Sequence, residues 1–348
     1  MTPVYARAMR EKSYDQAVIE QATDLTSSRP KLERIDSGRI LAVAMIMTSC
    51  RRRAGKWILI LAWLSSAGTI DRPAPASAYA PGTSAQHFVW RVTNASEPFY
   101  LVGSIHNLTT QDYPLPPIYE TALAKSKRVV FEFNPHQRDR LERKFREIGR
   151  YPAGQDIETE ASPRTVALLK KNVWRFGLRF DALRHLRPWA IALRLLSGQG
   201  PVGPSTARSM DSYLGMEASR AGKELAGLET VDEHVAFWQQ MLERDGENLL
   251  LYALTQEAKV GRLFEKTRDA WKRGDLAALS ATNARLHRAN PGIAQKLLDR
   301  RNAQWVTRIE AEIKSGKATT IVAGAGHFSG PHSVIALLRA RGYRIQRL

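Results

Sequence analysis

The sequence predicts an α/β fold, in the wide sense that includes α+β, with a mixed sheet and a large helical insertion. Short apolar runs typical of buried strands lie at residues 88–133 and again at 318–348. Between about 160 and 315 the apolar residues recur at helical spacing instead. The sheet is therefore expected to take its strands from both ends of the chain.

The first part of the chain predicts a hairpin followed by a third strand. The runs 88–92 and 99–103 flank a turn-rich connection, which is typical of an antiparallel hairpin. A proline-rich break at 114–117 separates them from a short helix at 118–126. The next strand is expected to end in Glu132, and a densely charged segment after it is expected to form an exposed helix.

The same patterns predict the secondary structure of the middle and the end of the chain. Within the helical region, residues 222–229 read as a short strand entered by a turn. Residues 198–204 are rich in Gly and Pro and are expected to form a loop. A strand at 318–323, a helix at 333–341 and a last strand at 343–348 complete the prediction. We expect one domain with a helical middle (160–315), since the strands lie on both sides of it.

Residues 45–80 have the pattern of a secretory signal peptide. Three arginines at 51–53 precede the apolar run 57–64, and small residues follow at 74–80. The apolar run is shorter than the roughly 20 residues of a membrane span. We therefore expect a mature domain over 81–348 that is exported to the periplasm.

Two alternatives concern this N-terminal region. Residues 1–44 are expected to be either a non-native extension, with translation starting at Met45 or Met47, or a cytoplasmic tail. In the second case the signal would stay uncleaved as an inner-membrane anchor, and this segment would be the protein's only link to a membrane. Cys50 is the only cysteine and precedes the apolar run, so cleavage would leave no disulfide or thiolate ligand.

The chain is strongly basic, with a formal net charge of +18. Such a charge favours anionic partners, for example an acidic polysaccharide. No basic-aromatic motif or recognisable nucleic-acid-binding module is present, so nucleic acid is not expected as a partner.

A candidate metal site follows from three strand ends. The pattern Gly-x-x-His occurs after two apolar runs and supplies His106 and His327, while a third run ends in Glu132. Ligands of open α/β sheets bind at the carboxyl ends of strands. Two imidazoles and one carboxylate at that edge could hold a metal ion and leave one coordination position free. Alternatively, the histidines are structural and Glu132 pairs with an arginine.

Three further residues are catalytic candidates beside Glu132. Asp211 and Glu229 could orient the histidines through their second ring nitrogen, although Asp211 could equally cap a helix. Arg301 could stabilise an oxyanion or form a salt bridge with one of the acids. The other histidines are expected to be structural or exposed, namely residues 87, 136, 185, 234, 287 and 332.

Taken together, these segments resemble the TraB/GumN family (TraB/PrgY/GumN), which includes the Tiki-type proteases. The resemblance runs from about residue 87 to 348, and rests on the segments at 103–106, 113–116, 130–132, 187–189, 210–214, 227–230, 301–302, 324–330 and 342–348. It implies a core related to the erythromycin-esterase and ChaN-like folds, with His106, Glu132 and His327 at the site and Arg301 nearby. The sequence departs from the family pattern at Arg300 and His234.

The functional expectation is an exported, metal-dependent hydrolase of the peptidase type. The resemblance implies a divalent ion, with Mn, Co or Zn all compatible, and a peptide or another small polar substrate. A metal-independent esterase-like hydrolase would instead use His106 or His327 as general base. A third alternative is a non-catalytic envelope protein whose basic surface binds an acidic polysaccharide or another partner.

Overall fold

The computed structural model describes residues 86–348 apart from 107, 197–208, 256 and 290. The expected N-terminal extension (1–44), the signal peptide (45–80) and the Gly/Pro-rich loop at 198–204 lie outside these residues. Among the helices that are described, none combines the length and the apolar character needed to cross a membrane.

The sheet is mixed and contains six strands among the described residues, in the order β4-β3-β5-β2-β1-β6. β2, β5, β3 and β4 run parallel to one another, whereas β1 is antiparallel to both of its neighbours. The predicted α/β class and the opening hairpin are confirmed. The bounds are β1 Val89–Val92, β2 Phe99–Ser104, β3 Arg128–Phe133, β4 Glu224–Glu229, β5 Thr319–Gly324 and β6 Ile345–Arg347.

Strands from both ends of the chain meet in the middle of this sheet. β5 enters between β2 and β3, and all six of its residues are buried, as its run of small and β-branched residues requires. Its register pairs Ser104 with Gly324. The two Gly-x-x-His segments therefore leave the sheet side by side.

Three strand boundaries differ from the sequence-based expectation. Glu132 lies inside β3 and not at its end. β4 begins at Glu224, after a turn in which Gly222 has a φ of 66°, a conformation that favours glycine. β6 is shorter than predicted, because Tyr343 and Arg344 donate their backbone N–H groups outside the strand ladder.

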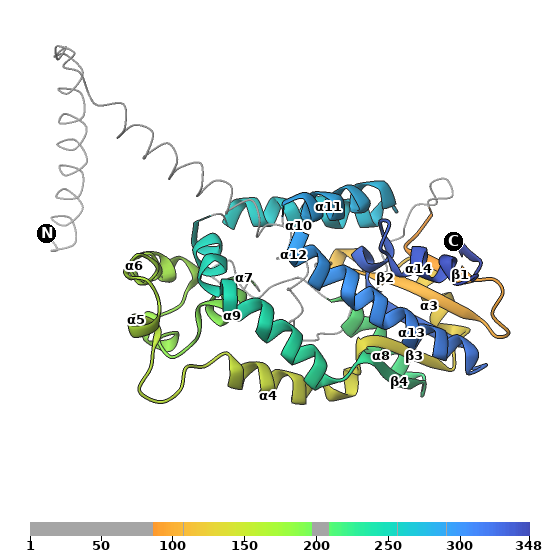
Figure 1. Cartoon of the computed structure of the whole chain (residues 1–348), viewed down its shortest axis with the longest axis horizontal. Helices are drawn as coiled ribbons and strands as arrows, with labels where there is room; N and C mark the ends of the chain where they lie inside the picture. Colours follow the sequence, from red (N-terminus) through yellow and green to blue (C-terminus); the bar gives the residue numbers. More distant parts are fainter. Residues whose placement is uncertain (1–85, 107, 197–208, 256, 290) are drawn as a thin grey trace, which may run out of the picture. The chain divides into compact units, whose positions relative to one another are not determined.

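Helices surround the sheet and fill the middle of the chain (Figure 1). Their bounds are α3 Pro117–Ala124, α4 Arg138–Ile148, α5 Ile157–Glu160, α6 Pro163–Asn172, α7 Pro188–Leu196, α8 Met210–Arg220, α9 Val231–Thr255, α10 Glu257–Lys272, α11 Leu276–Ala289, α12 Pro291–Ala294, α13 Arg301–Lys314 and α14 Val334–Ala340. A π-helical turn, η6 (Gln295–Arg300), leads directly into α13.

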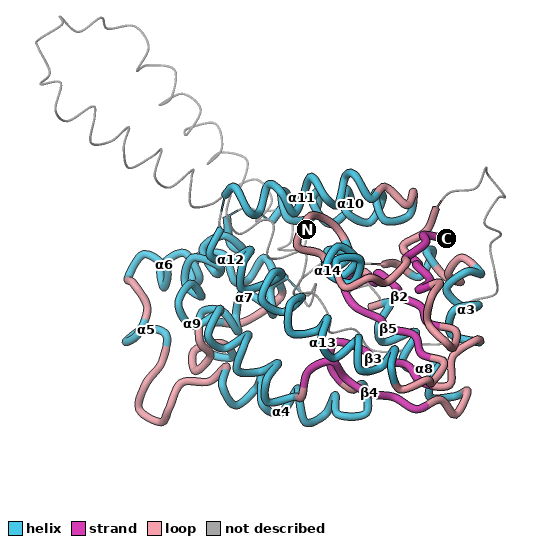
Figure 2. Tube along the Cα trace, turned by 45° about the vertical axis from the view of Figure 1, so that its right-hand side comes forward, coloured by secondary structure: helices cyan, strands magenta, loops and turns pink. Residues whose placement is uncertain are grey.

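Two large hydrophobic clusters lie inside the described part of the chain. The first packs both faces of the sheet against α3, α8, α13 and α14. The second joins α6, α7 and α9 and contains Trp189 and Trp238. Figure 2 shows the same division, with α5, α6 and α7 at the end of the domain opposite β2. Trp189, Trp238 and Trp305 are all buried in these clusters.

Candidate functional site

The two histidine-bearing segments follow neighbouring parallel strands. His106 comes two residues after the end of β2, and His327 lies in the short helical turn η7 (Ala325–Phe328) after β5. A Cβ atom at Gly103 would come within 3.1 Å of the Cα of Ala325, so only glycine lets the two segments approach this closely. Glu132 on β3 and Glu229 at the end of β4 reach the same edge of the sheet.

A buried guanidinium joins the acids of β3 and β4. Arg301, only 3% exposed on the first turn of α13, donates from Nε to Glu229 Oε1 at 2.7 Å. Its Nη2 donates both to Glu229 Oε2 at 3.0 Å and to Glu132 Oε2 at 2.9 Å. We call Glu132, Glu229, Arg301 and His327 the Arg301 cluster. Of the two roles expected for Arg301, its geometry shows the salt bridge to the acids.

Hydrogen bonds fix the proton on the ring of His327. Asn302 donates from Nδ2 to the carbonyl of His332 at 2.8 Å, which turns its Oδ1 toward His327. His327 Nδ1 lies 2.6 Å from that oxygen and must carry the proton, which leaves Nε2 as a lone-pair donor. Nε2 is 3.5 Å from Arg301 Nη1 and 3.9 Å from Glu132 Oε1. Burial and the charge of Arg301, opposed by that of Glu132, lower the pKa of His327 to about 3.

The acids of the Arg301 cluster are held ionised. Burial alone would raise their pKa values, but the charge of Arg301 and the hydrogen bonds and other charges around the carboxylates together outweigh it. The pKa of Glu229 falls to about 2, with a hydrogen bond from His234 contributing as well. The pKa of Glu132 falls further below its usual range, helped by His327, by the N–H of Gly324 and by the charge of His106.

His234 belongs to this network, although no sequence pattern indicated that it would lie there. Its Nδ1 lies 2.8 Å from Glu229 Oε2, while Trp238 donates its indole N–H to Nε2 at 3.0 Å. Because an indole can only donate, Nε2 is unprotonated and the ring is neutral. Trp305 donates to Glu229 Oε1 at 2.9 Å. His234 and Trp238 are four residues apart on a helix, and this spacing alone does not indicate that His234 contacts a site carboxylate.

His106 pairs with Asp211 on α8. His106 Nδ1 lies 3.3 Å from Asp211 Oδ2 and 3.2 Å from the hydroxyl of Ser209. Ser104 donates its hydroxyl to the other oxygen, Oδ1, at 2.9 Å. Asp211 therefore contacts a histidine, as an orienting carboxylate would. It does not occupy the N-cap position of α8, which belongs to Ser209.

The His106–Asp211 pair lies within electrostatic reach of the Arg301 cluster. Burial raises the pKa of Asp211, the charge of His106 opposes this, and the negative charge of Glu132 adds to it. The exposed fractions of the His106 and Asp211 side chains are 16% and 19%, in contrast to the fully buried His327. The site therefore has an accessible half and a buried half.

Two helices hold the loops that carry the histidines. Trp271 on α10 donates its indole N–H to the carbonyl of Gly103 at 2.8 Å. Asn283 on α11 donates to the carbonyl of Gly326 at 2.8 Å and to the hydroxyl of Ser329 at 2.7 Å. These buried side chains come from the helical middle of the chain, so the insertion fixes the geometry of the sheet edge.

The donor atoms suit a metal ion, but no coordination sphere is formed among the residues that the structure describes. No group of three or more His, Cys, Asp and Glu side chains within them is arranged to hold an ion. Each histidine nevertheless has its Nδ1 facing an oxygen acceptor, which is the usual environment of a ligating imidazole. Metal ligation by His106, His327 and Glu132 stays a prediction.

Comparison with known proteins identifies the family. Neither the curated proteins nor the solved structures compared with the chain give a match. The family model described as the TraB/PrgY/gumN family matches residues 88–347, which includes every strand of the sheet and all the residues of the candidate site. The chain belongs to the TraB/PrgY/gumN family.

Proposed function

We propose that this protein is an exported, metal-dependent hydrolase of the peptidase type, with its site at the carboxyl edge of the parallel strands. The observation that carries the proposal is the pair of imidazoles, His106 and His327, whose Nδ1 atoms both face oxygen acceptors. In this proposal the ion is bound by their Nε2 atoms. Glu132 is the third ligand in this proposal, since Arg301 binds its other oxygen, Oε2, and Oε1 accepts one hydrogen bond, from the N–H of Gly324.

Charge in the Arg301 cluster supports a bound cation. Two ionised carboxylates face one guanidinium, and His327 is neutral, so the cluster keeps one uncompensated negative charge. Buried charge of this kind is costly unless it is paired or bound to a cation. A divalent ion, with Mn, Co and Zn all compatible with these donors, would polarise a carbonyl oxygen and lower the pKa of a water molecule.

In this proposal Asp211, Glu229 and Arg301 accept a proton or hold the other residues in position. Asp211 is the better proton acceptor of the two orienting acids, because its raised pKa lies closer to neutrality than the pKa of about 2 at Glu229. Glu229 holds Arg301 in place. Arg301 in turn orients Glu132 through its Oε2.

Metal content tests the proposal directly. The purified protein, analysed by inductively coupled plasma mass spectrometry, should hold close to one divalent ion per chain. His106→Ala should lose it, whereas His136→Ala, a change at an exposed histidine near α4, should keep it. A wild-type protein that hydrolyses a fluorogenic peptide library equally well without metal and in the presence of a chelator would contradict metal dependence.

The His106–Asp211 pair also supports a second candidate, a metal-free hydrolase. A carboxylate 3.3 Å from Nδ1 orients an imidazole and leaves its Nε2 free to act as general base. Of the two histidines, His106 fits this role, since the pKa of His327, about 3, makes it a weak base. Hydrolysis of p-nitrophenyl esters that survives chelation but is lost in His106→Ala would favour this candidate.

A further inference from the structure

One large aromatic side chain protrudes from the surface of the helical middle. Trp174 is 70% exposed, whereas the five other tryptophans that the structure describes are buried. It lies in the short helical turn η4 (Val173–Phe176), which continues α6 and ends at Gly177 with a φ of 66°. Figure 2 shows α6 at the end of the domain opposite β2, so a large partner can approach this turn.

The residues beside Trp174 anchor its turn in the protein. Val173 and Phe176 are each 4% exposed and belong to the second hydrophobic cluster. The indole N–H of Trp174 donates to the carbonyl of Lys171 at 2.8 Å. Since this N–H is the only polar group of the side chain, Trp174 presents an apolar ring to solvent from a fixed position.

Three cations flank this ring. Lys171, Arg175 and Arg179 are all exposed, and we call them together with Trp174 the Trp174 patch. Neither Lys171 nor Arg179 forms an ion pair within the described ranges. The surrounding segment, residues 163–187, contains seven Lys and Arg but only one acid. A single exposed aromatic residue is common on protein surfaces, but this one lies within an excess of positive charge.

The acids closest in sequence are already paired with other cations. Glu158 on α5 forms ion pairs with Lys170 and Arg184. Asp156, the N-cap of α5, forms an ion pair with Arg184 as well. The positive charge of the Trp174 patch is therefore available to an anionic partner.

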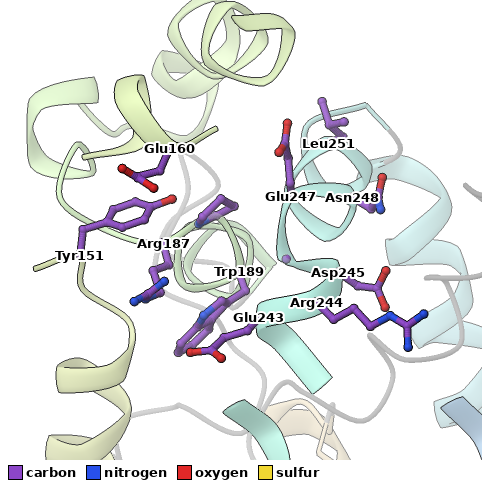
Figure 3. Close-up of a pocket in the computed structure, with 12 residues that line it drawn as sticks. Tyr151, Glu160, Arg187, Trp189, Glu243, Arg244, Asp245, Glu247, Asn248 and Leu251 are labelled. Atoms are coloured by element: carbon purple, nitrogen blue, oxygen red, sulfur yellow. The ribbon is translucent and has the colours of Figure 1, made fainter. Parts of the chain in front are cut away.

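Other acids at this end of the domain surround a pocket. It has a volume of about 380 Å³ and is lined by α9, by the first turn of α7 with Trp189 and by the loop that carries Tyr151. Figure 3 shows Tyr151 and Glu160 on one side of it and Glu247 on the other. No residue of the Trp174 patch lines this pocket. The acids and the exposed cations thus lie on separate parts of the surface.

The Trp174 patch has the chemistry of a surface that binds anionic lipid. Lysine and arginine are attracted to anionic headgroups, and tryptophan is enriched at the headgroup level of membranes. An acidic polysaccharide fits less well, because its hydroxyl groups need neutral hydrogen-bonding partners. The two neutral donors of this turn are already used, since Asn172 donates to the carbonyl of Leu168 at 2.8 Å and Trp174 donates to that of Lys171.

We propose that the Trp174 patch binds the surface of an anionic phospholipid membrane. The indole lies at the headgroup level, and Lys171, Arg175 and Arg179 lie against the phosphates. Binding is peripheral and reversible, because one ring and three cations bury far less apolar area than a spanning helix. This contact adds to any that the N-terminal segment makes. It does not depend on the hydrolase proposal, since the two share no residue.

Vesicle flotation tests the charge of the patch. The purified full-length protein should bind vesicles of equal parts phosphatidylglycerol and phosphatidylcholine, and high salt should weaken this binding. Lys171→Gln with Arg179→Gln should lower the partition coefficient about thirtyfold, at about 1 kcal/mol for each cation. Residues 1–85 are the same in both proteins, so the comparison isolates the patch.

A matched double variant controls for the basic character of the whole chain. Arg262→Gln with Lys266→Gln removes one arginine and one lysine from exposed positions of α10. It should change the partition coefficient much less than the change at Lys171 and Arg179. Equal losses in the two double variants would overturn the proposal, because only net charge would then matter.

Quenching of tryptophan fluorescence tests contact of the ring with the bilayer. Lipids brominated in the acyl chain quench only those tryptophans that reach the bilayer. Vesicle-bound wild type should therefore be quenched more strongly than vesicle-bound Trp174→Phe. Trp189→Phe, a change at a buried tryptophan, should be quenched at least as strongly as wild type. Equal quenching of wild type and Trp174→Phe would overturn the proposal.

A soluble acidic polysaccharide separates the two sources of negative charge. Polygalacturonate should bind wild type and Trp174→Ala equally, since only net charge attracts it. If its binding depends on Trp174, and the protein floats equally with neutral and anionic vesicles, the membrane proposal is overturned and the patch is a saccharide site.

Discussion

At the residue scale, Glu229 joins three other side chains of the site. Its two oxygens accept from Arg301, from Trp305 and from His234, and all four side chains are buried. Removing one partner of a buried ion pair leaves the other charge uncompensated, which usually costs more than the pair contributes. Glu229 therefore matters more for the shape of the site than for proton transfer.

Glu229→Gln should lower the free energy of unfolding by about 3 kcal/mol, at the low end of the range for broken buried pairs because Glu132 still binds Arg301. Denaturant unfolding measures this. Glu233→Gln is the control, since Glu233 pairs with Arg308 on the surface and should change stability by less than about 1 kcal/mol. Equal losses of stability in the two variants would show that the buried contacts of Glu229 contribute no more than a surface ion pair.

His327 should make the protein less stable in mild acid. Its pKa is about 3 in the folded chain, well below the 6.5 of an ordinary histidine, so between these pH values only the unfolded chain takes up this proton. The free energy of unfolding should fall from this cause by up to about 1.4 kcal/mol per pH unit as pH drops from 6.5 toward 3. Denaturant unfolding between pH 7 and 5.5 should therefore show a shallower slope for His327→Gln than for wild type. Parallel slopes would contradict a neutral buried ring.

At the scale of elements, α7 and α9 pack closely because of one glycine. A Cβ on Gly246 of α9 would lie 2.9 Å from the Cβ of Trp189 and 3.1 Å from its backbone nitrogen. The second of these atoms belongs to the backbone and cannot move aside by a rotamer change. This contact fixes the position of Trp189 in the second hydrophobic cluster and in the pocket.

Gly246→Ala should lower the free energy of unfolding by about 1–3 kcal/mol, since overpacking outweighs the gain in helix propensity. Gly292→Ala is the matched control within α12, because a Cβ at that position would meet no atom within 4 Å. It should leave stability unchanged or raise it. A stabilised Gly246→Ala protein would mean that α7 and α9 can separate without cost.

The π-helical turn η6 is a second element with a local effect on the site. It ends at Arg300, so the next two residues, Arg301 and Asn302, open α13 and turn toward Glu229 and His327. π-Helical turns are found mostly where function requires an irregular helix. His287 on α11 lies 3.1 Å from Asp299 and ties this turn to the helix that holds Gly326.

At the scale of the whole molecule, the sheet depends on its central strand. Both neighbours of β5 come from the first half of the chain, and its residues are buried on both faces. Ile321→Ala should therefore lower the free energy of unfolding by about 2–5 kcal/mol, as for other buried truncations. Leu225→Ala on the edge strand β4, where the side chain is only partly buried, should cost clearly less. Comparable losses would show that the sheet has no dominant strand.

The sequence predicted the sheet better than it predicted the site. Buried strands with glycine at their ends are visible as local patterns, and the strand-end rule placed His106, Glu132 and His327 on one edge. The pairing of Arg301 with both acids, and the roles of His234 and Asn302, arise from helices that pack onto that edge. Arg301 lies 72 positions from Glu229 and 169 from Glu132, and Asn302 lies 25 positions from His327, so no local pattern encodes these contacts.

The position of β5 has a consequence for chains that are cut short. A ribosome completes β1 through β4 long before residues 319–324 emerge, and until then β2 and β3 have no shared neighbour. A polypeptide that stops before Thr319 would hold two strand pairs with exposed apolar flanks and only one of the two histidine motifs. Premature termination would thus produce an aggregation-prone fragment and not a folded domain with a weakened site.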